Sequence, residues 1–353
     1  MKSNKKWFIV TLLGTIISLA VILVVMIIVD PYFHYHGKIS GISYRIYYER
    51  YINDGIAKHF DYDAIITGTS MNQNFKATKM NELFDVNTVK MTYSGGGFQE
   101  IADNLEVALN SGNQVKYVLW GLDYHALSRV YDWKAYTDYP EYLYDDNIWN
   151  DVSYFWNKSI LFEGLFTNLL MTLKGEPTTT FDEYSAWDNG YGWEVISKTY
   201  QRSDEIKPME EEMTEREKER TKENIVENIV KLVNQYPDTE FVFFYTPYSV
   251  YFWESIYRDG TLNKQLEAEK IATELLLQCQ NVTLFNFHSE TDITGNDENY
   301  CDKEHYIQEI NDLILEWIVQ GNGLVTEDNY LDMIQWQKEY YTNYNYDRLY
   351  KNI

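Results

Sequence analysis

Short apolar runs alternate with helical patterns along most of this chain, and this alternation constrains the fold more than any other feature. Five runs of apolar or β-branched residues have the length of a buried strand; they span residues 64–67, 87–91, 116–120, 240–245 and 282–287. Four segments repeat apolar residues at helical spacing; they span residues 97–110, 215–234, 262–278 and 304–319. The sequence therefore predicts a doubly wound α/β domain with a five-stranded parallel sheet.

A serine follows the first of these runs, in the small-residue turn Gly68-Thr69-Ser70. Open α/β sheets place their chemistry at such turns, where parallel strands end. Near the other end of the chain, Asp302 and His305 are three positions apart, so one carboxylate can orient one imidazole. Serine, histidine and aspartate in these roles make a nucleophile, its base and the group that orients the base. We predict that Ser70, His305 and Asp302 converge in the fold.

In the order of these motifs, roughly residues 56–320 resemble the SGNH (GDSL-type) hydrolase superfamily. Ser70 matches the family's nucleophile, and Asp302 and His305 match its Asp-x-x-His. More narrowly, the chain is similar to the membrane-anchored members that modify cell-envelope polymers, such as the D-alanyl transfer protein of teichoic acid synthesis and the alginate acetylation proteins. The resemblance implies a flavodoxin-like strand order and chemistry through an acylated serine, without a cofactor.

Donors for an oxyanion are expected from two backbone turns. One is the N–H of Ser70 itself, and the other lies in the glycine run after the second strand, where Gly95 matches the family's oxyanion glycine and Gly96 is its neighbour. Asp123 stands where the family has an asparagine, and an ionised carboxylate cannot donate to an oxyanion. Either Asp123 has another role, such as binding the acceptor or fixing a loop, or a neighbouring group such as His125 takes over the role of the third donor.

Each of these residues also has a purely structural interpretation. Ser70 at a strand-to-helix turn is a good helix N-cap, and Asp302 with His305 can be a local Asx-type cap beside a surface histidine. Their order along the chain, with a glycine turn between them, favours the catalytic interpretation. His288, at the end of the fifth strand, is the rival base.

An uncharged apolar stretch from Trp7 to Val29 precedes the domain. Its 23 positions make about 34 Å of helix, which is enough to cross a bilayer. The lysines before it place the N-terminus in the cytoplasm and the remainder outside the cell. The expected parts are residues 1–6 as a cytoplasmic tail, 7–29 as the transmembrane helix, 30–55 as a juxtamembrane segment, 56–320 as the extracytoplasmic domain and 321–353 as a C-terminal helical extension. A cleaved signal peptide is the alternative, but the run is long and lacks an Ala-x-Ala-like site.

About eighty residues, 129–208, show no clear strand-helix unit and are rich in aromatic and acidic side chains. Such an insertion can be a lid or a binding element, and aromatic rings beside carboxylates suit sugar rings. Tyr184 and Trp187 are the residues that we expect at such an acceptor site. The other interpretation is that these aromatic residues form a small satellite core.

Charge and cysteine content narrow the choice of partners. Without the three lysines before the apolar stretch, the net charge of −24 becomes −27 for residues 30–353, which argues against nucleic acid as a partner. Cys279 and Cys301 are the two cysteines, so a disulfide framework is excluded. Two unpaired buried thiols are expected, and a single bridge between them is the alternative. Neither has ligand spacing for zinc, and we predict no metal.

Together these features predict an extracytoplasmic serine-dependent enzyme that transfers an acyl group to a cell-surface polysaccharide or teichoic acid. A membrane-bound O-acyltransferase is the expected acyl source. Removal of acyl groups by the same machinery is the nearest alternative. A non-catalytic glycan-binding or assembly protein that retains the fold is the competing class, and the aspartate at position 123 keeps it open.

Overall fold

The computed structural model describes residues 2–135, 140–145, 147–209 and 212–350, and the chain forms two compact units. The first unit comprises Met1–Phe60 and Asp138–Thr180, and the second comprises Asp61–Thr137 and Phe181–Ile353. The expected insertion 129–208 is thus divided between them, and its residues 136–139 and 146 lie outside the described residues. The expected cytoplasmic tail and C-terminal extension also end in such residues, namely residue 1 and residues 351–353.

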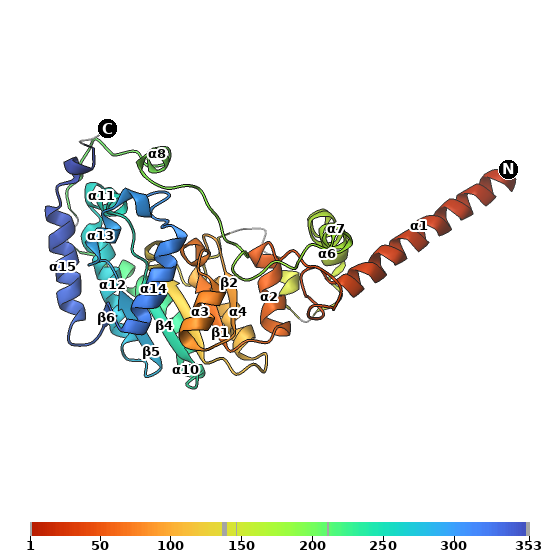
Figure 1. Cartoon of the computed structure of the whole chain (residues 1–353), viewed down its shortest axis with the longest axis horizontal. Helices are drawn as coiled ribbons and strands as arrows, with labels where there is room; N and C mark the ends of the chain where they lie inside the picture. Colours follow the sequence, from red (N-terminus) through yellow and green to blue (C-terminus); the bar gives the residue numbers. More distant parts are fainter. Residues whose placement is uncertain (1, 136–139, 146, 210–211, 351–353) are drawn as a thin grey trace. The chain divides into compact units, whose positions relative to one another are not determined.

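The second unit is built on one six-stranded sheet in the order β2-β1-β3-β4-β5-β6 (Figure 1). Its strands are β1 (Ala64–Gly68), β2 (Thr88–Thr92), β3 (Tyr117–Leu122), β4 (Glu240–Tyr245), β5 (Val282–Asn286) and β6 (Leu324–Val325). The first five are parallel, and β6 pairs antiparallel with β5. The expected count of five was wrong because β6 has two residues and no apolar run of its own.

Helices cover this sheet in two groups. In the first group, α3 (Ala77–Phe84) contacts α14 (Gln308–Gln320). The second group consists of four helices that contact one another directly or through the π-helical η4 (Val226–Val230): α4 (Phe98–Leu109), α5 (Tyr124–Leu127), α9 (Glu215–Ile225) and α12 (Leu262–Leu276). The first two strands are buried along their whole length. Burial on both faces explains why these strands read as continuous apolar runs rather than alternating ones.

Several helix boundaries differ from the expected ones for local reasons. The segment expected as one helix over 215–234 is α9, η4 and then α10 (Lys231–Gln235), and it begins at a capping box in which Thr214 and Glu217 bond each other. The helix expected from residue 304 begins at Gln308, because the residues before it form a turn. The C-terminal α15 (Tyr330–Asn343) packs on the same unit, where Tyr341 stacks on Trp253 with ring centroids 4.2 Å apart.

Shorter elements complete the second unit. They are η1 (Ser70–Asn72), α8 (Trp193–Ile196), α11 (Val250–Arg258), α13 (Thr291–Thr294), η5 (Asp297–Asn299) and η6 (Tyr346–Tyr350).

The first unit is organised around the end of the long apolar helix α1 (Lys2–Val29). It also contains α2 (Glu49–His59), η2 (Glu141–Leu143), α6 (Val152–Phe155), the π-helical η3 (Ile160–Phe166) and α7 (Thr167–Lys174). Asp30, which ends α1, is fully buried and accepts hydrogen bonds from the backbone N–H groups of His34, Tyr35 and His36 and from the Tyr154 hydroxyl. Tyr154 of the aromatic insertion is therefore part of a small core at the end of α1, whereas other aromatic residues of this insertion are exposed. Residues Lys5–Val29 are long and apolar enough to span a membrane, a property that a signal sequence would share.

Candidate active site

Ser70 lies in a turn that is seated on the ends of two strands. It begins η1 directly after β1, and Thr69 caps that short helix by accepting the N–H of Met71. The side chain of Asn72 fills the space above Gly68 and Gly121, which are paired in register at the ends of β1 and β3. A Cβ at either glycine would lie 2.5 Å or less from Asn72 Oδ1. The two glycines therefore provide the room that this turn needs.

Asp302 shapes the second half of the site by bonding both the backbone and the ring of the same turn. Its Oδ1 accepts the N–H groups of Glu304 and His305 at 2.7 Å each, and its Oδ2 lies 2.8 Å from Nδ1 of His305. The turn is closed further by the N–H of Cys301, which donates to the carbonyl of His305 at 2.8 Å. These bonds replace the first helical turn that the sequence suggested, and they fix the direction of the imidazole.

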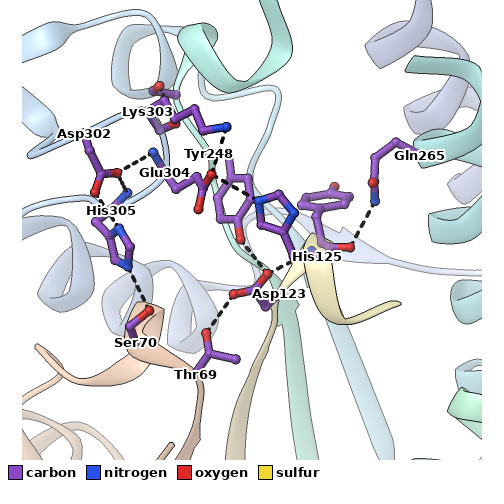
Figure 2. Close-up of polar contacts among 12 residues, drawn as sticks. Thr69, Ser70, Asp123, His125, Tyr248, Gln265, Asp302, Lys303, Glu304 and His305 are labelled. Atoms are coloured by element: carbon purple, nitrogen blue, oxygen red, sulfur yellow. Dashed lines mark hydrogen bonds and ion pairs between the residues drawn. The ribbon is translucent and has the colours of Figure 1, made fainter. Parts of the chain in front are cut away.

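The fixed imidazole faces the serine. Nε2 of His305 lies 2.8 Å from Oγ of Ser70, so one continuous line of hydrogen bonds joins Ser70, His305 and Asp302 (Figure 2). Since Asp302 accepts at Nδ1, the neutral ring carries its proton there and leaves Nε2 to accept from the Ser70 hydroxyl. The three side chains that the sequence singled out are thus brought together from opposite ends of the domain.

The protonation states follow from opposed influences. Burial by itself lowers the pKa of His305, but the hydrogen bond and charge of Asp302, with the charges of Glu304 and Asp123, raise that pKa above its ordinary value. Burial raises the pKa of Asp302, yet its bonds to His305 and to the backbone hold it below its usual range. The carboxylate is therefore ionised when the imidazole titrates, and it stabilises the imidazolium form.

The two glycines expected as oxyanion donors in the turn after β2 differ in their hydrogen bonds. Gly96 donates its N–H to the carbonyl of Tyr93 at 2.7 Å, so it is a turn donor in this structure, and its assignment as an oxyanion donor was wrong. Gly95 has φ +61°, a conformation that favours glycine. Within the described part of the chain, the N–H groups of Gly95 and Ser70 have no protein acceptor. These two remain the candidates for holding an oxyanion.

Asp123 fixes the loops behind the serine. Its Oδ2 accepts the hydroxyl of Thr69 at 2.9 Å, and its Oδ1 accepts the hydroxyl of Tyr248 at 2.6 Å and the N–H of His125 at 2.9 Å (Figure 2). All three contacts use the carboxylate as an acceptor. Of the two expected roles, loop positioning is the one that this geometry supports, because Asp123 ties the end of β3 to the residue before Ser70.

A second histidine–carboxylate pair lies beside Asp123. Nε2 of His125 is 3.1 Å from Oε1 of Glu304, and the His125 side chain is half exposed. Burial lowers the pKa of His125, but the hydrogen bond and charges of Glu304 and Asp123 raise it overall. Sequence reasoning found His125 and missed Glu304, although Glu304 stands between Asp302 and His305. Glu304 is adjacent to the predicted histidine, but the sequence gives no indication that it pairs with His125, which is 179 positions away.

The two aromatic residues expected at the acceptor site have different surroundings. The Trp187 ring lies edge-on to His305 with ring centroids 5.4 Å apart, and its backbone N–H donates to Asn74 at 2.9 Å. Trp187 is part-buried. Tyr184 is 1% exposed, so it cannot stack on a sugar, and that assignment was wrong. Tyr184 is core, and Trp187 is the residue of this pair that borders the imidazole.

The remaining candidate groups are inert in this fold. His288 is fully buried between the rings of Tyr124 and Trp253, and burial lowers its pKa to about 3. It is therefore not the base for Ser70. Cys279 and Cys301 are free buried thiols, as expected, and burial raises the pKa of Cys301 to about 11. Among the described residues, no group of three or more His, Cys, Asp or Glu side chains could hold a metal ion.

We expect Asp123→Ala to lower the free energy of unfolding by about 1–3 kcal/mol, because the Thr69 and Tyr248 hydroxyls and the His125 N–H lose their acceptor. Hydrolysis of a small activated ester should fall with it, since the turn that carries Ser70 is released. Urea unfolding and initial rates measure the two effects. Tyr248→Phe removes one donor and keeps the carboxylate, so its effect should be smaller; an Asp123→Ala protein with unchanged stability and rate would contradict the positioning role.

Comparison with known proteins gives a distant structural likeness and no match in sequence. Neither a protein-family model nor a curated protein sequence matches the chain. Among solved structures, a protein from Streptococcus pneumonia, described only provisionally as a platelet activating factor, aligns over 78% of this chain and 90% of its own, with 11% sequence identity and a TM-score of 0.41.

Proposed function

We propose that this protein is a serine-dependent acyl-group enzyme of the SGNH type, in which Ser70 carries the acyl group. The observation that carries the proposal is the line from Ser70 Oγ to His305 and from His305 to Asp302, with 2.8 Å at each step. A helix cap would need no histidine at that distance, and the observed cap of η1 is Thr69, not Ser70. The structural interpretation of the serine is therefore weaker than the catalytic one.

The proposed reaction has two halves. Ser70 Oγ attacks the acyl carbonyl carbon while Nε2 of His305 takes the hydroxyl proton, and the N–H groups of Ser70 and Gly95 hold the oxyanion. The bond to the leaving oxygen breaks, that oxygen takes the proton from His305, and acyl-Ser70 remains. In the second half His305 takes a proton from the acceptor hydroxyl, whose oxygen attacks acyl-Ser70, and then returns that proton to Ser70.

We assign O-acyl transfer onto a cell-surface polysaccharide or teichoic acid as the biological direction, with deacylation as the alternative outcome. Two features support it: an apolar helix able to anchor the chain at a membrane, and the motif resemblance to membrane-anchored enzymes of envelope polymers. A membrane-bound O-acyltransferase would supply the acyl group. Of these acceptors, the acidic charge of the chain favours a neutral or cationic polysaccharide over the polyanionic teichoic acid.

Trapping the acyl-enzyme tests this proposal. Full-length protein treated with 4-nitrophenyl acetate and quenched in acid should carry one acetyl group on the peptide that contains Ser70, and a fluorophosphonate should label the same peptide. Addition of a glycan acceptor should speed the loss of the acetyl group and yield acylated glycan. A folded protein with no modification at Ser70 under either reagent would refute acyl-serine chemistry, whereas release only to water would favour the deacylase.

We expect Trp187→Ala to raise the KM for a glycan acceptor roughly two- to tenfold, which is the scale of one lost ring contact. Hydrolysis of 4-nitrophenyl acetate should change less, because that substrate is small. Trp336→Ala is a matched control, since Trp336 is also part-buried and stacked on one ring, that of Tyr340. Equal losses with glycan and with the small ester would show instead that Trp187 serves only to pack against His305.

The proposed anchor gives a separate expectation. Full-length protein should fractionate with membranes, and protease added to cells stripped of their wall should reach the domain, because the lysines at the N-terminal end of α1 favour a cytoplasmic N-terminus. N-terminal sequencing of the mature protein is the measurement that decides. A soluble protein beginning well after residue 29 would show that α1 is a cleaved signal, and the acyl handover at the membrane would lose its support.

A further inference from the structure

One helical segment of the first unit is apolar on two opposite sides. η3 and α7 run on without a break over residues 160–174. Their inner side buries Ile160, Gly164 and Asn168, and a Cβ on Gly164 would lie 3.0 Å from the side chain of Pro31. This side therefore packs directly on the residues that follow α1. Ordinary surface helices turn polar residues to the other side.

The outer side of the same helix carries large apolar side chains that are exposed. We call them the apolar stripe; they are Phe162, Phe166, Leu170 and Leu173, with 63%, 59%, 40% and 85% exposure. Their spacing of four, four and three residues places them on one side of a helix. Between Lys158 and Lys174 the chain has one charged residue, Glu163, and its carboxylate accepts the Tyr48 hydroxyl. The stripe therefore contains no charge.

The segment just before the stripe continues this character. Around α6 the chain exposes Trp149 at 84%, Val152 at 62% and Trp156 at 42%. α6 is joined to the end of α1, because the Tyr154 hydroxyl donates to Asp30 at 2.6 Å and accepts the N–H of Tyr32 at 3.2 Å. Tryptophan is the residue type that gathers where apolar and aqueous phases meet.

The apolar stripe lies near the end of α1, and this position indicates that lipid covers it. Ile27 and Ile28, in the last turn of α1, are 44% and 52% exposed, so a bilayer that holds this helix reaches its final turn. Pro31, against which η3 packs, is two residues after Val29, the last residue of α1. The α1 and η3 segments contact each other. The helix that carries the apolar stripe therefore lies beside the end of α1, at the level where the chain would leave a membrane.

We infer that the η3–α7 helix lies in the membrane interface and buries the apolar stripe among the lipid headgroups and upper acyl chains. The inference rests on the proposed membrane anchor. Lys158 and Lys174 flank the helix and are exposed, as is Arg45, whose backbone N–H donates to Asn168 of α7 at 2.8 Å. These cations suit anionic headgroups, and apolar area together with basic flanks is what holds interfacial helices on lipid. The first unit thus meets the bilayer by two elements, one crossing it and one lying on it.

Site-specific fluorescence in pure lipid vesicles tests this inference. Full-length protein with Phe166→Cys or Leu173→Cys is labelled with an environment-sensitive fluorophore and reconstituted in phosphatidylcholine–phosphatidylglycerol vesicles. Ile17→Cys in α1 is the lipid-exposed control, and Leu331→Cys in α15, 51% exposed, is the aqueous control. The unchanged chain, whose two cysteines are buried, gives the background labelling. Quenching by acyl-chain doxyl lipid and by aqueous iodide is then compared.

Labels at residues 166 and 173 are expected to lose most of their emission to doxyl lipid and little to iodide, as at residue 17, with the reverse at residue 331. If residue 17 reports lipid while residues 166 and 173 are quenched by iodide as strongly as residue 331, the inference is overturned and a protein partner is the cover of the stripe. If residue 17 also lies in water, the anchor fails and this inference fails with it, but the acyl-serine chemistry of Ser70 does not.

Discussion

Replacing Ser70 by alanine is expected to reduce acyl transfer and ester hydrolysis by at least about 10⁴-fold in kcat. The oxygen removed is the atom that would carry the acyl group, and the His305 ring, 2.8 Å away, would be left with only water to activate. Residual rates would reflect the oxyanion donors and substrate binding alone. Initial rates with 4-nitrophenyl acetate, and acyl content of the surface polymer in cells, measure the loss.

The same substitution should leave the fold intact. Ser70 is part-buried and its hydroxyl faces the site, so the free energy of unfolding should change by less than about 1.5 kcal/mol. Ser197→Ala, at an exposed serine of the same unit, is the matched control and should keep full activity. Normal polymer acylation in a strain with well-expressed Ser70→Ala protein would exclude the serine mechanism and leave a non-catalytic glycan-binding protein as the explanation.

The sheet was predictable because each buried parallel strand is a short apolar run between helical segments. The five predicted runs agree with β1 to β5 to within about two residues at their ends, as is usual for such boundaries. Strand β6 was not predictable, because a strand of two residues after a glycine turn is too short to show a hydrophobic period. The sequence also did not predict that residues 129–208 are divided between the two compact units. Asp30 and Tyr154 are joined across 124 positions, and the sequence carries no local sign of that buried bond.

The candidate site was predictable where one turn contains the whole arrangement. Asp302 and His305 interact three positions apart, and Ser70 follows a strand end, so residue type and spacing pointed to them. The roles of Asp123 and Tyr184 depended on tertiary neighbours. Asp123 is a positioning residue because the Thr69 and Tyr248 hydroxyls both donate to it. Tyr184 is a core residue because its segment belongs to the unit that contains the sheet, where its side chain is buried.

Replacing Asp302 by asparagine is expected to lower kcat by about 10³- to 10⁴-fold, because an amide at this position can donate to Nδ1 and favour the tautomer with its proton on Nε2. That tautomer cannot accept the Ser70 proton. The pH profile should change as well. In the native protein the base works when it is neutral, so activity rises with pH through the raised pKa of His305, at a midpoint above the ordinary value of 6.5.

In Asp302→Asn, the direction in which the pH midpoint of activity moves depends on which influences on the pKa of His305 remain. Burial, which lowers the pKa of His305, is unchanged, whereas the hydrogen bond and charge that raise it are lost, so the midpoint of the residual activity should move to lower pH. Glu304→Gln is the discriminating control: it removes a neighbouring charge and keeps the Asp302 bond, so it should shift the midpoint in the same direction with a far smaller loss of kcat. A kcat in Asp302→Asn equal to that of the native protein, with an unmoved midpoint, would mean that His305 is not the base that activates Ser70.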